Sequence, residues 1–300
     1  MNKIVVIGSS NTDMVVRSET LPRPGESVLG GDFMRAGGGK GANQAIAVAR
    51  MGHKVIFSAA VGRDMFGDSA IAGYQRFGVD TSYIVRNDTP SGIGLIMVDS
   101  AAQNSISVAL GANNCLTAED VMPALEHISE GDIVLLQLEI PMSTVDACVA
   151  VAAQKGAKVV LNPAPAAVVC EQTLSKLYLI TPNQTEAQTL TGIEVVDEAS
   201  ATAAAKALTA KGVERVVITM GSQGSFLYQD GEGVIIPAHK VAAVDTTAAG
   251  DVYNGALCAA IAEGMTLEDA LCFATKAAAI SVTRPGAQPS VPSREEVDNF

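Results

Sequence analysis

From residue 132 onward, short β-branched runs alternate with segments of helical pattern, and this alternation constrains the fold more than any other feature of the sequence. The expected strands are residues 133–138, 158–161, 177–180, 215–219, 225–228 and 234–236. The expected helices are residues 143–154, 184–190, 199–210 and 252–262, with one more after Leu267. Such alternation is typical of parallel sheets, because each connecting helix packs on a face of the sheet. The sequence therefore predicts an α/β fold, a doubly wound and mostly parallel sheet covered by helices.

The N-terminal part adds one central strand and several weaker ones. Residues 3–7 (KIVVI) predict a buried strand, and the polar loop at residues 8–13 follows its carboxyl end, where open α/β sheets bind ligands. Residues 26–35, 92–98 and 105–109 are short and mildly alternating, which indicates exposed strands. We group them as a small inserted β lid over about residues 14–36 and 92–109. No linker or repeat divides the chain, so we expect a single domain over residues 1–300.

The composition restricts the possible partners. Lys and Arg total 20 against 32 Asp and Glu, a formal charge of −12, and no basic run is interleaved with aromatic residues. Nucleic acid is therefore not an expected partner. An anionic substrate would have to be held by helix termini, a metal ion or a few placed cations.

Cysteine and histidine usage disfavours two kinds of site. The five cysteines include no C-x-x-C pair and the three histidines are not clustered with them, which argues against a zinc site and against a Ser-His-Asp nucleophile. The apolar run in residues 1–8 is too short for a secretory signal, and no run reaches the length of a membrane span. We expect a cytoplasmic protein without a membrane partner.

Residues 244–251 (VDTTAAGD) directly precede the expected helix 252–262. The small residues Ala248, Ala249 and Gly250 allow a close approach to the N–H groups of a helix N-terminus, which favour negative charge. Asp251 adds a carboxylate that can accept a proton beside these donors, as phosphoryl transfer requires. The alternative is ordinary helix capping, with Asp251 complementing the helix dipole. Taken alone, the stretch favours the capping interpretation.

Residues 37–43 (GGGKGAN) open a second expected helix, residues 44–51, which ends at Gly52. A phosphate-binding P-loop would need Ser or Thr where Gly41 stands and Gly where Met34 stands, and the loop after the first strand lacks the G-x-G-x-x-G fingerprint. Two interpretations stay open. The loop lets the backbone approach a small polar ligand, with Asn43 and Lys40 as contacts, or it is a glycine hinge.

Polar residues follow each expected strand of the C-terminal part. Glu139, Asn162 and Asn183 come after three successive strands, and Thr219 ends the next. Because the carboxyl ends of parallel strands meet at one edge of a sheet, we expect these residues to line one crevice.

Together, residues 38–43 and 245–251 resemble the two signature motifs of the ribokinase-like (PfkB) sugar kinases. The similarity extends over the chain, at residues 11–13, 137–139, 162–165, 181–183, 219–222 and 284–290. The resemblance implies a ribokinase-like fold and an ATP-dependent kinase that phosphorylates the O5 hydroxyl of D-ribose to ribose 5-phosphate. It also implies Mg²⁺ at the phosphates, activation by K⁺ and a homodimer formed through the lid.

The resemblance implies a role for each residue of the motifs. Asp251 would be the catalytic base, and Ala249 with Gly250 would form the anion hole. The implied sugar-binding residues are Asn11, Asp13, Gly39, Lys40, Gly41, Ala42, Asn43 and Glu139. The implied nucleotide-binding residues are Asn183, Thr219, Met220, Gly221, Ser222, Gln223, Gly224, Gly250 and Thr275. The implied ligands of a monovalent cation, several through backbone carbonyls, are Asp245, Thr247, Ser281, Arg284, Gly286 and Ser290.

The sequence departs from the family pattern at the nucleotide site and leaves other functions open. Thr275 stands where His or Asn is frequent, Gln223 replaces a basic residue, and Val252 follows Asp251 where Thr is frequent. A kinase for 2-deoxyribose or a nucleoside is one alternative, and a non-catalytic sugar-binding regulator is another. The missing glycine fingerprint argues against a dinucleotide-dependent dehydrogenase.

Overall fold

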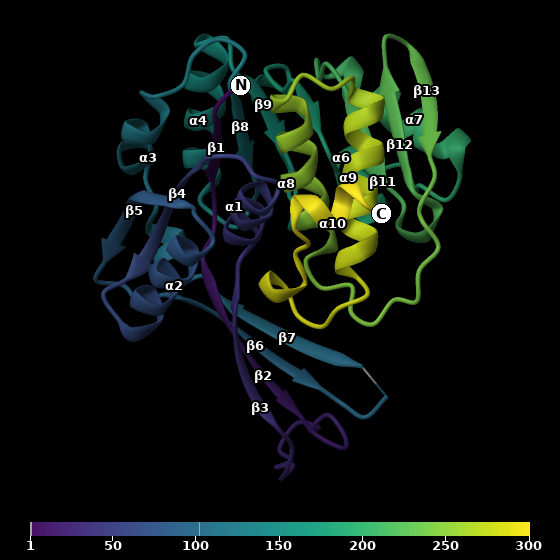
Figure 1. Ribbon diagram of the computed structural model, residues 1–300. Helices are drawn as coiled ribbons and strands as arrows, with labels where there is room; N and C mark the ends of the chain where they lie inside the picture. The colour runs from purple at the N-terminus through teal and green to yellow at the C-terminus, as the bar shows by residue number, and fades with distance from the viewer. Residues whose placement is uncertain (1, 102) are drawn as a thin grey trace.

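The computed structural model describes residues 2–101 and 103–300; position 102, which falls in the predicted lid segment 92–109, lies outside the described residues. Within these residues the chain forms a nine-stranded sheet, a four-stranded sheet and helices that cover both faces of the larger sheet (Figure 1). None of the described helices combines the length and the apolar character that a membrane crossing requires.

The larger sheet has the strand order β13-β12-β11-β10-β9-β8-β1-β4-β5, with β1 (Ile4–Ile7) inside it. Its other strands are β4 (Val55–Gly62), β5 (Asp80–Asn87), β8 (Ile133–Leu136), β9 (Lys158–Leu161), β10 (Leu179–Ile180), β11 (Val216–Thr219), β12 (Ser225–Gln229) and β13 (Glu232–Ile236). The neighbouring strands from β5 to β11 pair in parallel, whereas β12 pairs antiparallel with both β11 and β13. The prediction of a mostly parallel sheet is confirmed.

Helices bury both faces of this sheet, which explains why β1 carries no polar residue. Ile4 and Val6 belong to one core cluster and Val5 and Ile7 to the other, because successive side chains of a strand point to opposite faces. The first cluster includes residues of α1 (Lys40–Arg50), α8 (Ala249–Ala262) and α9 (Leu267–Ser281). The second includes residues of α3 (Ala118–Leu125), α4 (Met142–Gln154), α6 (Gln184–Thr191) and α7 (Glu198–Ala210). Figure 1 shows α8 and α9 in front of the sheet and α4 and α7 behind it, so the doubly wound arrangement is confirmed.

The remaining helices are short or lie at the edges of the molecule. They are α2 (Met65–Arg76), α5 (Glu171–Leu174), α10 (Arg294–Asp298) and the 3₁₀ turns η1 (Gly111–Cys115), η2 (Gly221–Gln223) and η3 (Gln288–Ser290).

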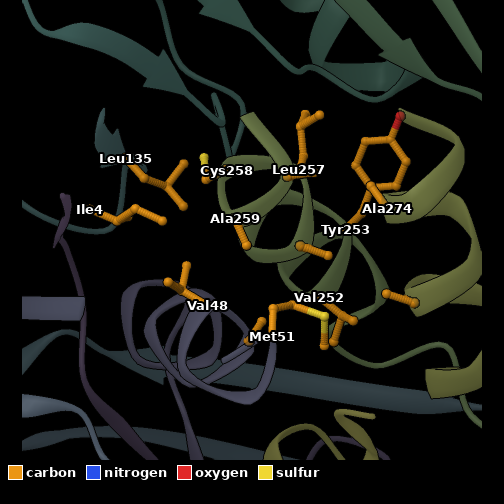
Figure 2. Packing of buried hydrophobic residues seen from close by; sticks show 14 of the residues in the cluster. Ile4, Val48, Met51, Leu135, Val252, Tyr253, Leu257, Cys258, Ala259 and Ala274 are labelled. Carbon is orange, nitrogen blue, oxygen red and sulfur yellow. The ribbon is translucent and has the colours of Figure 1, made fainter. Parts of the chain in front are cut away.

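Helix α8 is buried from Asp251 to its end and packs closely on α1. Figure 2 shows its side chains between those of β1, β8 and α1, with Val48 and Met51 opposite Ala259 and Val252. A Cβ atom at Gly255 would lie 2.7 Å from the Gln44 carbonyl oxygen and would also collide with Ala47. Glycine at this position therefore lets the two helices approach, and it places the first turn of α1 beside Asp251.

The smaller sheet has the order β3-β2-β6-β7 and extends away from the rest of the molecule (Figure 1). Its strands are β2 (Asn11–Arg17), β3 (Phe33–Gly38), β6 (Gly92–Val98) and β7 (Asn104–Ala109). Only residues 8–10 separate β1 from β2, so one continuous stretch of chain passes from the larger sheet into the smaller one.

Three predictions for this region are wrong in their boundaries. The polar loop is residues 8–10 and not 8–13, because Asn11 and the two residues after it pair with both β3 and β6. The strand predicted at residues 26–35 begins only at Phe33 and continues to Gly38, since residues 33–38 find their partner in β2. The helix predicted to start at residue 44 begins at Lys40, directly after Gly39 turns the chain with φ 90°.

Most predictions after residue 132 are confirmed within one or two residues. The strand predicted at 133–138 ends at Leu136, so Gln137 and Leu138 belong to the loop after it. The strand predicted at 177–180 is only the pair Leu179–Ile180. No helix or strand was predicted for residues 55–87 or 118–125, which form β4, α2, β5 and α3.

Candidate active site

Asp251 lies in the first turn of α8 and is buried, with 6% of its surface exposed. Asn43 donates from Nδ2 to Asp251 Oδ2 at 2.9 Å, and Gln44 donates from Nε2 to Asp251 Oδ1 at 3.0 Å. Burial raises the pKa of Asp251, while the charge of Lys40 and the two amide donors oppose that rise. The carboxylate is therefore held in place by α1 and remains able to accept a proton.

The start of α8 has an unusual backbone conformation. Ala248, at the N-cap, adopts a left-handed conformation with φ 61°, which is strained for a residue with a Cβ atom. The N–H of Ala249 donates to Thr246 O at 3.2 Å, whereas in the described part of the chain the N–H groups of Gly250 and Asp251 have no protein acceptor. A Cβ atom at Gly250 would meet no atom within 4 Å. The open space and the free donors make this helix end able to receive an anion.

Asp13 and Glu139 lie near Asp251 and extend the site toward the smaller sheet. Ser9 donates from Oγ to Glu139 Oε2 at 2.5 Å, and the Lys40 backbone N–H donates to the same oxygen at 3.1 Å. Burial, with the charges of Glu139 and Asp251, raises the pKa of Asp13 to about 6. These acceptor groups suit a ligand that brings several hydroxyl donors.

Lys40 is the cation among these carboxylates. Burial alone would lower the pKa of its ammonium group, but the charges of Asp251, Glu139 and Glu186 outweigh burial and raise it. Lys40 therefore remains charged and offsets part of the negative charge of the site.

Glycines before and within the first turn of α1 are required by close contacts. A Cβ atom at Gly38 would collide with the Asp13 carboxyl group, and one at Gly41 would lie 2.6 Å from the backbone of Gly8 and Ser9. Gly38 and Gly41 therefore allow the chain to pack closely beside the site. The two interpretations left open for residues 37–43, approach of a polar ligand and a glycine hinge, both stay predictions.

Two amides of the predicted sugar site have different surroundings. Asn11 accepts at Oδ1 from Asn113 Nδ2 at 2.7 Å, and Asn113 also accepts from the Ser10 N–H at 2.8 Å. Asn113 was not predicted, since it lies in a short 3₁₀ turn with no motif around it. Asn43 Oδ1 is buried, and within the described residues it has no hydrogen-bond partner. It is therefore available to a ligand hydroxyl.

A pocket of about 480 Å³ borders the α8 N-terminus, and its lining includes Ala249 and Gly250 but not Asp251. It contains six of the predicted nucleotide-binding residues: Thr219, Gly221, Ser222, Gly224, Gly250 and Thr275. The pocket is also lined by residues that were not predicted from the sequence, among them His239, Lys240, Tyr253 and Ala278. No local pattern marks them, because they come from the coil after β13 and from buried helix faces.

Three predicted nucleotide-binding residues do not line this pocket. The Met220 side chain is buried, and Gln223 is exposed in η2. Asn183 caps α6 in a reciprocal arrangement, accepting from the Glu186 N–H while Glu186 accepts from the Asn183 N–H. The structure therefore gives Asn183 a local structural role, next to β11 through its bridge to Thr219.

Two of the predicted cation ligands, Thr247 and Gly286, are bonded to Asp245. Its Oδ1 accepts from the Thr247 N–H at 2.9 Å and its Oδ2 from the Gly286 N–H at 2.8 Å. The N–H groups of Val244 and Asp245 both donate to Val282 O, which joins this loop to the end of α9. The Arg284 side chain forms an ion pair with Glu296 on α10, with 2.6 Å between Arg284 Nη2 and Glu296 Oε1. Only the backbone of Arg284 is therefore available to a cation.

The donor set around Asp245 fits a monovalent cation. The hydroxyl protons of Ser281 and Ser290 are donated to backbone carbonyls, which leaves oxygen lone pairs free. In the described part of the chain, no three His, Cys, Asp or Glu residues gather in a way that could hold a metal. One carboxylate with carbonyl and hydroxyl oxygens matches a hard ion of low charge.

Known proteins are similar to this chain over nearly its whole length. The family model described as pfkB family carbohydrate kinase matches residues 1–294. A ribokinase of Haemophilus influenzae is 43% identical over 298 residues, covering 99% of this chain and 97% of the relative. A deoxyribokinase of Salmonella typhimurium is 36% identical over 299 residues, covering 99% of this chain and 98% of the relative. The solved structure of Arabidopsis thaliana ribokinase complexed with ribose and ATP superposes with a TM-score of 0.92 at 32% identity, covering 99% of this chain and 98% of the other.

Replacing Asp13 by Asn should stabilise the unliganded protein at neutral pH but not in acid. The Asp13 carboxyl has a pKa of about 6 when folded against 3.8 in its ordinary state, so ionisation destabilises the folded state as the pH rises from about 4 to 6. The shift corresponds to an upper limit of about 3 kcal/mol. Urea unfolding of both proteins at pH 4 and at pH 7.5 measures the effect.

The exposed carboxylate of Asp88 offers a matched control, since Asp88→Asn should change the free energy of unfolding little at either pH. A stability difference between Asp13→Asn and wild type that is the same at both pH values would contradict the assignment.

Proposed function

This chain belongs to the pfkB family of carbohydrate kinases, and from that premise we propose that it transfers the γ-phosphoryl group of ATP to the O5 hydroxyl of D-ribose. One observation carries the proposal: the N-terminus of α8 borders both halves of the site. Gly250 lines the 480 Å³ pocket, and the next residue, Asp251, bonds to Asn43 on the side of the predicted sugar residues. The reacting groups of two substrates would therefore meet at one helix end.

Asp251 is the proposed general base. The O5 hydroxyl must lose its proton as the phosphoryl group arrives, and a buried carboxylate with a raised pKa is suited to take it. The N–H groups of Gly250 and Asp251 would stabilise the negative charge on the transferring group. Ala249 contributes less in this conformation, because its N–H already donates to Thr246 O.

The substrates are assigned to opposite sides of Asp251. The pocket that includes Thr219, Gly224 and Thr275 would take ATP, with Mg²⁺ entering on the phosphate oxygens. Asp13, Asn43 and Glu139 would take the sugar hydroxyls. The relative from Arabidopsis thaliana, which is described with both ribose and ATP, supports this pair of substrates.

A kinase for 2-deoxyribose is the second candidate, because a deoxyribokinase is among the similar proteins. The two sugars differ by one hydroxyl, which the acceptor groups of Asp13 and Asn43 would bind in ribose and lose in the deoxy sugar. A nucleoside would have to place a base at C1, where the smaller sheet would close. A non-catalytic regulator is disfavoured, since a sugar binder has no need of a buried carboxylate beside free helix N–H groups.

We assign the smaller sheet the role of a lid within a single-domain kinase and extend the proposal to a homodimer. On the face that carries Asp13, the strand register places Val15, Ile96, Ile106 and Val108, of which Ile106 is 56% exposed. A second lid would cover this apolar face.

Sedimentation equilibrium should give twice the chain mass, and a monomer at micromolar concentration would contradict the proposal of a homodimer.

Asp251→Asn should abolish most of the turnover while ribose still binds. The amide cannot accept the proton, so kcat should fall by about 10²- to 10⁴-fold. ADP release measures kcat, and calorimetry with ribose measures binding. Asp269→Asn removes an acid from the first turn of α9 and is the control that should keep normal kcat. Near-normal turnover of Asp251→Asn would remove Asp251 from the role of base.

The preference for ribose over 2-deoxyribose should depend on Asp13. A buried polar group left without its hydroxyl costs about 1–3 kcal/mol, so kcat/KM for deoxyribose should be lower by about one to two powers of ten. The ratio of kcat/KM values is measured in wild type and in Asp13→Asn. A wild-type ratio at or below one would favour the deoxyribose kinase, and an unchanged ratio in the variant would show that Asp13 does not read the hydroxyls.

Potassium should raise the activity well above that in a buffer free of sodium and potassium. A cation bound by Asp245 and the surrounding carbonyl oxygens would fix the backbone that leads into Gly250. Steady-state rates over a potassium titration test this in wild type and in Asp245→Asn, which should respond weakly. Equal activity of the wild type with and without potassium would refute the cation site.

A further inference from the structure

Two neighbouring amides of α1 donate to the Asp251 carboxylate, and the second of them, Gln44, lies behind the base. Gln44 has no exposed surface, whereas Asn43 is 5% exposed and has a free Oδ1. Gln44 Nε2 donates to Asp251 Oδ1 at 3.0 Å, on the oxygen that Asn43 does not contact. Gln44 can therefore influence the substrate only through other residues, of which Asp251 is a direct partner.

The Gln44 amide has one allowed orientation. Its Nε2 also donates to Asn162 Oδ1 at 3.0 Å, and its Oε1 accepts from Gln137 Nε2 at 2.6 Å. A primary amide has two N–H donors and one carbonyl oxygen, so its donors are both used and its oxygen is engaged. Turning the amide over would place the Gln44 oxygen against two acceptor oxygens and its nitrogen against the Gln137 donor. The neighbours therefore fix the direction of the N–H that points at Asp251.

A chain of hydrogen bonds returns from Asn162 to the first turn of α8. Asn162 Nδ2 donates to Thr181 O at 3.2 Å, and Thr181 Oγ1 donates to Asn254 Oδ1 at 2.6 Å. Asn254 Nδ2 then donates to the Gly250 carbonyl at 2.8 Å. The loops after β8, β9 and β10 are thereby bonded, directly or through α1, to the helix end that carries the base.

We propose that Gln44 is a positioning residue for the phosphoryl transfer: its amide fixes the Asp251 carboxylate through Oδ1 and leaves Oδ2, beside Asn43, to accept the substrate proton. This inference rests on the proposed role of Asp251 as the base.

The ionisation of Asp251 depends on groups from several elements. Burial raises its pKa and Glu139, after β8, raises it further, while Lys40, Asn43 and Gln44 of α1 lower it. Asp13 on β2 and Glu186 on α6 interact with the Asp251 charge as well. Without the Gln44 donor, two of the three groups that favour the charged base remain.

The test is the pH dependence of Gln44→Met, which keeps a similar length and lacks the donor. We expect kcat at pH 7 to fall about 10- to 100-fold, and the acid limb of the kcat profile to move up by about one pH unit. The KM for ribose should change by less than about threefold, because Asn43 and Asp13 remain. An acid limb at the wild-type position would overturn the proposal, since a purely structural role would not move it in either direction.

Two further variants keep the test decisive. Thr144→Val, on α4, removes a buried hydrogen bond from Thr144 Oγ1 to the Leu116 carbonyl oxygen and should lower Tm without moving the acid limb. Gln44→Glu has the size of glutamine, and its carboxyl would share a proton with Asp251, so the acid limb should rise at least as far as in Gln44→Met. If Gln44→Met does not fold, a Gln44→Glu variant with the wild-type profile would overturn the proposal.

A readout without turnover separates this inference from the proposed function. The ¹³C carboxyl resonance of Asp251, identified by its loss in Asp251→Asn, should titrate at higher pH in Gln44→Met than in wild type. Failure of the wild type to release ADP with ribose would refute the proposed function but not this titration. If the wild type is active and the Asp251 resonance titrates at the same pH in Gln44→Met as in wild type, the role of Gln44 is refuted and the proposed function is not.

Discussion

The close packing of α1 on α8 is the contact on which the rest of the site depends. Gly255 permits it, and the buried cluster that joins both helices to β1 and β8 fixes it (Figure 2). The bond from Asn43 to Asp251 joins residues 208 positions apart in the sequence. Because effective proton transfer needs reacting groups held within fractions of an ångström, the same apolar packing that stabilises the fold also sets the geometry of the proposed base, Asp251.

The site holds more negative charge than its surroundings favour. Burial raises the pKa of Asp13, Asp251 and Glu186, and Lys40 lies in the field of Asp251 and Glu186. Without a ligand that brings hydroxyl donors, the ionised carboxylates destabilise the folded state, because burial removes their water and the protein replaces it only in part. We infer that the molecule retains this cost for function, since the same acceptors would bind a polyol.

Several segments that end near Asp251 have different tasks. The start of α8 offers free N–H groups, the loop from Asp245 to Thr247 holds a carboxylate bonded to Gly286, and the loops after β8 to β10 supply the amide chain through Gln44. All of them meet at the carboxyl edge of the parallel strands, where the strand ends of an open α/β sheet leave room for ligands. The ion pair of Arg284 with Glu296 ties the C-terminal helix α10 to this arrangement from outside.

The sequence by itself determined the fold class and suggested the groups that we propose as reacting. The β-branched runs after residue 132 predicted the strands of the parallel sheet because strands buried on both faces must be apolar throughout. Residues 38–43 and 245–251 predicted Lys40, Asn43 and Asp251 as site residues, because their glycines and charges form motifs that are local in the chain.

Only the tertiary structure decided where the boundaries lie and which ordinary polar residues join the site. Asn11 to Asp13 resemble a loop in sequence but form a strand, since their partners in β3 and β6 are distant in the chain. Gln44 and Asn254 carry no motif that distinguishes them from other buried amides, and the bond from Gln44 to Asn162 joins residues 118 positions apart. His239 and Lys240 reach the pocket from an irregular segment. Their convergence depends on strand order and helix packing, which act between distant parts of the chain and leave no local pattern to read.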